Sequence, residues 1–136
     1  MFFDTDNLKP VIKDLPNGSE LKMFLYIAFK QPDDGIRGYI TTKPQLAYDL
    51  KLQKTALFDC LKYLKDNLFI HELKRAEDFD FMANPHYVMN NSDRDARIAE
   101  WNRRLALDEQ REERLQHDRR LRAFRKAKKQ QKNAPT

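Results

Sequence analysis

Five side chains between residues 54 and 62 carry hydroxyl, charged or aromatic groups at a spacing that would place them on one side of a helix. They are Lys54, Thr55, Phe58, Asp59 and Lys62. Lysine and threonine bind phosphate oxygens, and lysine also binds a guanine edge. A carboxylate accepts a hydrogen bond from the cytosine amino group, and an aromatic ring can contact a thymine methyl group. These residue types therefore suit a helix lying in a DNA groove, or the solvated face of a helical domain that binds protein.

Two short helices joined by a tight turn would position these side chains. Thr42 is a typical N-cap, Pro44 fits the first helical turn, and Leu52 would fill the turn between the helices. Apolar residues at helical spacing predict that each helix has one buried face. These residues are Leu46, Ala47 and Leu50 in the first helix and Leu57, Cys60, Leu61 and Leu64 in the second. This is the spacing of a helix-turn-helix.

The flanking segments complete a larger pattern. Apolar spacing predicts a helix over residues 20–30, and 38–41 has the composition of a short strand. Asn67 is a plausible left-handed helix stop, and the strand-like segments 68–73 and 79–83 then form a hairpin that ends at Asn84-Pro85. The expected fold is mainly α with a small β-hairpin: a winged helix-turn-helix, followed by a long C-terminal helix.

The balance of basic and acidic residues differs between the two parts of the chain. Residues 1–91 hold 12 Lys+Arg against 13 Asp+Glu, and residues 92–136 hold 14 against 8. Beyond a break at 90–93, with Ser92 as N-cap, residues 94–129 contain no Gly or Pro and favour one long helix. We expect an N-terminal arm or short helix at 1–17, a winged-helix domain at 18–91, and a charged, basic C-terminal helix and tail at 92–136.

The predicted DNA interface extends beyond the second helix of the pair. It includes Thr42 and Lys43 at the start of the first helix, and Lys74 and Arg75 at the wing tip, although the tip is also consistent with an ordinary exposed turn. The basic tail adds Arg119, Arg120, Arg122, Arg125 and Lys126. Such a density of charge binds phosphates without reading sequence, but it also occurs on solvated helices.

The first turns of the long helix offer an apolar face. Ile98, Trp101 and Leu105 have 3-4 spacing, which predicts packing on the domain or on a partner. Asp108 and Glu112 interrupt this spacing, so a long uninterrupted coiled coil is not expected. A recruiting helix that also uses Leu115 and Leu121 remains an alternative role for this segment.

The sequence contains few residues that would suit catalysis or the binding of a metal or cofactor. Cys60 is the only cysteine and falls on a buried face, while His71, His86 and His117 are scattered without metal-ligand spacing. With 3 glycines and no nucleophile motif, we expect no catalytic residue, no metal and no cofactor. No apolar run approaches the length of a membrane span, and the first residues lack a basic signal region, which predicts a cytoplasmic protein.

Part of the chain, roughly residues 19–90, resembles the winged-helix replication proteins of bacterial plasmids and phages, of the RepL type. The resemblance is carried by Leu21-Lys22-Met23-Phe24-Leu25-Tyr26-Ile27, Thr41-Thr42 before Gln45-Leu46-Ala47, Lys54-Thr55, and Phe81-Met82-Ala83-Asn84-Pro85. It implies binding to a replication origin on double-stranded DNA and recruitment of host replication proteins, without catalysis. The long Arg-rich C-terminal helix departs from the family pattern.

The sequence therefore predicts a sequence-specific DNA-binding protein, with replication initiation of a plasmid or mobile element as the leading role. A small transcriptional repressor, which would act as a homodimer, would use the same surface. A protein-interaction adaptor that works through the C-terminal helix is the alternative from a different class.

Overall fold

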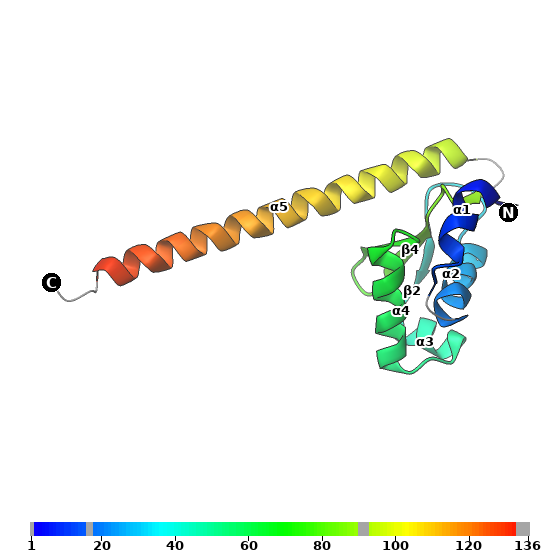
Figure 1. Cartoon of the computed structure of the whole chain (residues 1–136), viewed down its shortest axis with the longest axis horizontal. Helices are drawn as coiled ribbons and strands as arrows, with labels where there is room; N and C mark the ends of the chain where they lie inside the picture. Colours follow the sequence, from blue (N-terminus) through cyan, green and yellow to red (C-terminus); the bar gives the residue numbers. More distant parts are fainter. Residues whose placement is uncertain (1, 16–17, 90–92, 133–136) are drawn as a thin grey trace. The chain divides into compact units, whose positions relative to one another are not determined.

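The computed structural model describes residues 2–15, 18–89 and 93–132, in two compact units that meet between Asn102 and Arg103. Figure 1 shows the helices and strands in chain order. They are β1 (Phe2–Phe3), α1 (Thr5–Ile12), α2 (Gly18–Lys30), β2 (Tyr39–Thr41), α3 (Lys43–Leu50), α4 (Lys54–Asp66), β3 (Ile70–Lys74), β4 (Phe79–Ala83), β5 (Val88–Met89) and α5 (Arg94–Lys132).

The predicted helix pair is present as α3 and α4, and its ends have clear local causes. The Thr42 hydroxyl accepts a hydrogen bond from the Gln45 amide at 3.2 Å, and Pro44 lies in the first turn of α3. Lys51 ends α3 in the left-handed region with φ 55°. Asn67 caps α4 with φ −99°, so its predicted left-handed conformation was wrong; the positive φ of 59° falls on Leu68 instead.

The core lies where α2 packs against α4 and β4. Met23, Phe24 and Ile27 on α2 are completely buried, as are Leu46 on α3 and Leu64 on α4. The predicted inner face of α4 is confirmed in full, with Leu57, Cys60 and Leu61 also buried. Burying one such side chain contributes roughly 1.5–3 kcal/mol, so this face fixes which side of α4 remains outside.

The three strands β2, β4 and β3 form an antiparallel sheet in the order β2-β4-β3. Ile70 lies opposite Ala83, and Phe81 lies between Glu72 and Tyr39. The predicted hairpin is therefore confirmed as β3 and β4, and β2 adds a third strand from before the helix pair. Helix, strand, helix pair and hairpin in this order make a winged helix-turn-helix, followed by one long C-terminal helix.

The other face of this sheet is also covered. The alternation of apolar and acidic residues in 79–83 is typical of a half-exposed strand, yet both Asp80 and Met82 are buried. The buried Asp80 carboxylate accepts a hydrogen bond from the Gly38 amide at 2.9 Å, which offsets part of the cost of its burial. On the same face of the sheet, His71 packs edge-on against Trp101 of α5, with ring centroids 6.3 Å apart.

Arg97 fastens the first turns of α5 to the loop before β2. Its guanidinium donates hydrogen bonds to the carbonyl oxygens of Pro32, Asp34 and Arg37. The Gly35 amide donates to the Asp93 carboxylate at 2.9 Å. The side chain of Arg97 is fully enclosed, and this burial lowers its pKa. The hydrogen bonds to three carbonyl groups offset the cost of burying the charge.

The first unit is longer at both ends than the expected range of 18–91. At its start, β1 pairs antiparallel with β5, and α1, one of the two forms expected for residues 1–17, buries Leu8 in the core. At its end, the unit continues through the first turns of α5 to Asn102. The expected break at 90–93 and the Ser92 cap lie largely outside the described residues, which resume at Asp93.

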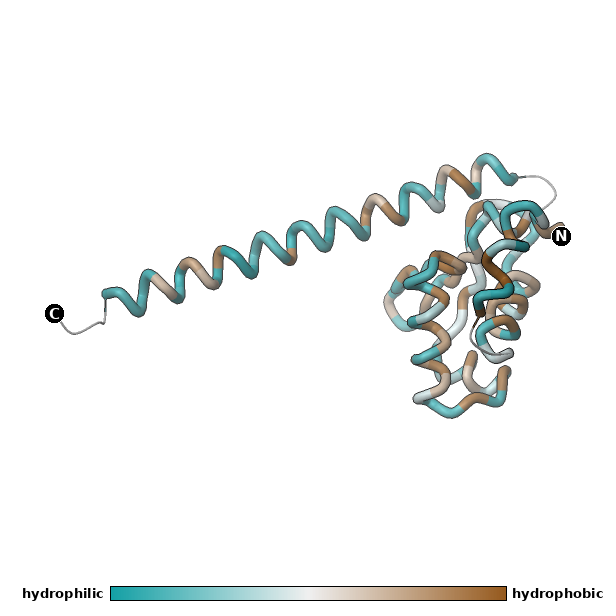
Figure 2. The backbone as a smooth tube through the Cα atoms, viewed as in Figure 1, coloured by the Kyte–Doolittle hydropathy of each residue, from teal (hydrophilic) through white to brown (hydrophobic). Residues whose placement is uncertain are grey.

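The second unit is the rest of α5, which continues three residues beyond the predicted end at 129. Figure 2 shows that its colouring is mostly hydrophilic toward the C-terminal end. Four large apolar side chains are nevertheless exposed on it: Leu107, Leu115, Leu121 and Phe124. No helix in the described part of the chain is long and apolar enough to cross a membrane.

Gly38 provides a test of the sheet. A Cβ at this position would lie 2.2 Å from the Phe81 carbonyl oxygen and 2.5 Å from the Asp80 carboxylate, and the backbone of β4 cannot move aside cheaply. We expect Gly38→Ala to lower the free energy of unfolding by about 1–3 kcal/mol in urea denaturation. Gly18→Ala is the control, because Gly18 has open space around it and alanine favours a helix. Equal stabilities of the two variants would contradict the assigned contact.

Candidate nucleic-acid interface

The outer side of α4 carries the five side chains that the sequence assigned to it. Lys54, Thr55, Phe58, Asp59 and Lys62 are all exposed, because the opposite side of the same helix is buried in the core. Lys62 pairs with Asp66 one turn later at 2.8 Å, and this hydrogen bond raises the pKa of Lys62. The helix thus presents two ammonium groups, a hydroxyl, a carboxylate and an aromatic ring along one side.

The start of α4 keeps backbone donors available. Gln53 precedes the helix in an extended conformation, and its side chain makes no capping hydrogen bond. The first amide groups of a helix have no acceptor within the helix, and they carry the positive end of its dipole. Together with Lys54, this end of α4 has the character of a phosphate contact.

Glu72 on β3 holds the wing against both helices of the pair. Its carboxylate oxygens lie 3.3 Å from the ammonium of Lys43 on α3 and 3.3 Å from that of Lys65 on α4. The three side chains are partly buried, and Glu72 is the most enclosed, at 14% exposure. Sequence reasoning missed this contact, because no pattern in 68–73 marks Glu72 as different from the neighbouring polar residues.

Lys43, which the sequence assigned to the DNA interface, is therefore a paired cation. Besides pairing with Glu72, its ammonium lies 4.4 Å from the ring centroid of Phe79 and 5.4 Å from that of Phe58. The ammonium of Lys54 lies 5.9 Å from the centroid of the same Phe58 ring. Thr42 is exposed, and its hydroxyl caps α3.

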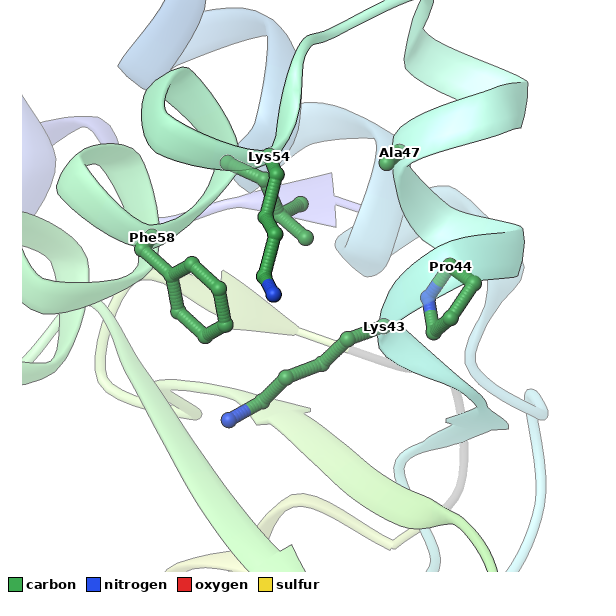
Figure 3. A pocket seen from close by; sticks show the side chains of 6 residues that line it. Lys43, Pro44, Ala47, Lys54 and Phe58 are labelled. Atoms are coloured by element: carbon green, nitrogen blue, oxygen red, sulfur yellow. The ribbon is translucent and has the colours of Figure 1, made fainter.

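An apolar hollow of about 270 Å³ lies between the start of α3 and the start of α4. Figure 3 shows the Phe58 ring, Lys54, Lys43 and Pro44 around it. Its lining residues are Lys43, Pro44, Ala47, Lys54, Leu57 and Phe58. Nearly all of the surface inside is carbon, and the two ammonium groups belong to lining side chains.

A hydrogen bond also joins α3 to α2. The Asp49 carboxylate accepts one hydrogen bond from the Tyr26 hydroxyl of α2 at 2.9 Å and another from the side-chain amide of Gln45 at 2.8 Å. Burial and the bond to Asp49 both raise the pKa of Tyr26, so the phenol remains a donor. The hollow thus lies beside a helix that is also held to α2 by a hydrogen bond.

The two predicted basic residues at the wing tip differ in their ion pairing. Lys74 and Arg75 are both exposed. The Arg75 guanidinium lies 3.6 Å from the Asp78 carboxylate, which reduces its net charge at the tip. Of the two, Lys74 is the stronger candidate for a phosphate contact.

The predicted partner face on α5 is changed by the fold. Trp101 is 2% exposed and packs edge-on against His71 of the chain's own sheet, so of the two alternatives that its spacing predicted, it packs on the domain. Ile98 is half-buried in the first unit, and Leu105 is half-buried in the second. The basic set Arg119, Arg120, Arg122, Arg125 and Lys126 is exposed throughout.

Cys60 is buried, as predicted, and has the environment of an inert thiol. Burial, together with the carboxylate of Glu20, raises the pKa of Cys60 to about 11. Within the described residues, no group of three or more His, Cys, Asp or Glu side chains is placed to hold a metal ion.

Comparisons of the chain with protein families, with curated proteins and with solved structures found no match.

The environment of Cys60 predicts its reactivity. At pH 8 the native chain should react with a thiol-specific reagent at least about 100-fold more slowly than the chain unfolded in urea, since a pKa of about 11 leaves little thiolate. The rate can be followed by the absorbance of the released chromophore. Similar rates in the two states would contradict the burial of this thiol.

Proposed function

We propose that this chain binds double-stranded DNA sequence-specifically, with α4 as the recognition helix in the major groove. The observation that carries the proposal is the pair of opposite faces on α4: a buried apolar face against α2 and the sheet, and an exposed face with Lys54, Asp59 and Lys62. A helix of this kind in a helix-turn-helix can insert into the groove without disturbing the core.

The parts around α4 support a division of roles. Lys54 and the uncapped start of α4 suit phosphate contacts, while Asp59 and Phe58 can distinguish a cytosine amino group and a thymine methyl group. Glu72 holds the wing in place beside the helix pair, and Lys74 extends from the end of β3. In this proposal the winged domain supplies specificity.

The basic end of α5 is proposed to add affinity rather than specificity. Residues 119–132 contain eight Lys or Arg residues and no Asp or Glu, whereas residues 103–118 contain four against five. Such a cationic stretch on an exposed helix releases counterions when it meets phosphates, whatever the base sequence.

The role proposed for DNA binding is replication initiation, on the strength of the resemblance to the RepL-type proteins. An initiator of this kind would bind directly repeated sites in an origin. A repressor would bind an inverted repeat as a homodimer. Footprinting on the DNA that surrounds the coding region distinguishes these two arrangements.

Two lysines on the outer side of α4 test the recognition helix. We expect Lys54→Ala with Lys62→Ala to weaken binding to a selected DNA site by about tenfold or more in a gel-shift titration. Lys9→Ala with Lys13→Ala removes the same charge from exposed positions in and after α1, and should leave affinity nearly unchanged. If both double variants bind alike, α4 is not the recognition helix.

The tail is tested by removing its charge while keeping its helix. The variant in which Arg119, Arg120, Arg122, Arg125 and Lys126 become Gln should reduce the slope of log affinity against log salt by up to about 4. Arg111→Gln with Arg114→Gln is the control, because these residues lie in the part of α5 where acidic residues balance them. An unchanged slope in the five-residue variant would show that the tail does not contact DNA.

A further inference from the structure

The apolar hollow between α3 and α4 offers little to a phosphate group, because nearly all of its surface is carbon. Besides Lys43 and Lys54, it is lined by Pro44, Ala47, Leu57 and Phe58, whose side chains cannot donate or accept hydrogen bonds to a base edge. The ring of Phe58 is 43% exposed and lines the hollow, whereas Leu57, Leu61 and Leu64 of the same helix are buried. A ligand for this hollow must therefore offer an apolar group.

The charged side chains at the rim of the hollow indicate which chemical groups should surround the apolar group of the ligand. The side chains of Lys43 and Lys54 both end near the Phe58 ring, with their ammonium groups 5.4 Å and 5.9 Å from its centroid (Figure 3). Glu72 neutralises part of the charge of Lys43, whereas Lys54 is exposed. The hollow thus suits a small apolar group on a polyanion.

Only one base edge in the major groove combines these properties. The C5-methyl group of thymine projects into the groove beside the O4 acceptor, and the phosphates flank it. We infer that the hollow lined by Pro44, Ala47 and Phe58 takes the methyl group of a thymine and makes the chain specific for thymine at that position. This inference rests on the proposed DNA binding and names the base that this part of α4 reads.

The test removes the methyl group without changing base pairing. A binding site is first selected from random duplexes with the full chain, and each thymine is then replaced in turn by deoxyuridine. We expect one replacement to weaken binding about fourfold, which is the contribution of one buried methyl group. The other replacements should have smaller effects.

Two variants assign the effect to the hollow. Phe58→Ala should bind the thymine and deoxyuridine sites equally well at that position, because the ring that covers the methyl group is gone. Tyr48→Ala is the matched control: Tyr48 is an exposed aromatic residue on α3 that does not line the hollow, so this variant should keep the fourfold discrimination. A urea unfolding curve for each variant verifies that it is folded.

The outcomes separate this inference from the proposed function. If the chain selects a site but binds thymine and deoxyuridine equally at every position, the inference is wrong and DNA binding stands. Discrimination that persists unchanged in Phe58→Ala also overturns it, since the methyl group is then read elsewhere. If no sequence is selected at all, the proposed function itself fails, and the inference fails with it.

Discussion

The arrangement of the surface depends on the burial of one side of α4. Leu57, Cys60, Leu61 and Leu64 are enclosed by α2 and the sheet, and no rotation of the helix could keep them dry while hiding Lys54 or Lys62. Hydrophobic burial thus sets the orientation of the charged face, although it contributes nothing to the chemistry there. The turn before α4 is fitted to this orientation by Lys51, which adopts a left-handed conformation that costs a residue with a Cβ about 1 kcal/mol.

Polar contacts then restrain the positions of α3 and the wing, which the apolar core alone leaves adjustable. Asp49 ties α3 to α2 through Tyr26, and Glu72 ties the wing to both helices of the pair. Partly buried ion pairs add little net stability on average, because desolvation offsets much of their attraction. Their contribution here is directional, because they join the wing to both helices of the pair at defined atoms.

The helix pair, the hairpin and the extent of α5 were predictable because each follows a regular spacing. The outer face of α4 was predictable as the remainder once its apolar residues were assigned. Other features depend on contacts between segments far apart in the sequence. Arg97 is buried because three carbonyl groups of the loop before β2 converge on it, and nothing in 94–102 signals this. The hollow beside Phe58 requires α3 and α4 to meet at one angle, and Lys43 reaches Glu72 only because β3 lies beside both helices.

The position of Trp101 has a spectroscopic consequence. It is the only tryptophan in the chain, and it is enclosed where the first turns of α5 meet the sheet. The fluorescence emission of Trp101 therefore reports on the contact between α5 and the sheet alone, rather than on an average over several tryptophans. Loss of this packing would expose the indole to water and shift the emission to longer wavelength, even if the helix pair stayed intact. The chain thus contains an intrinsic optical probe that reports the attachment of α5 separately from events at α4.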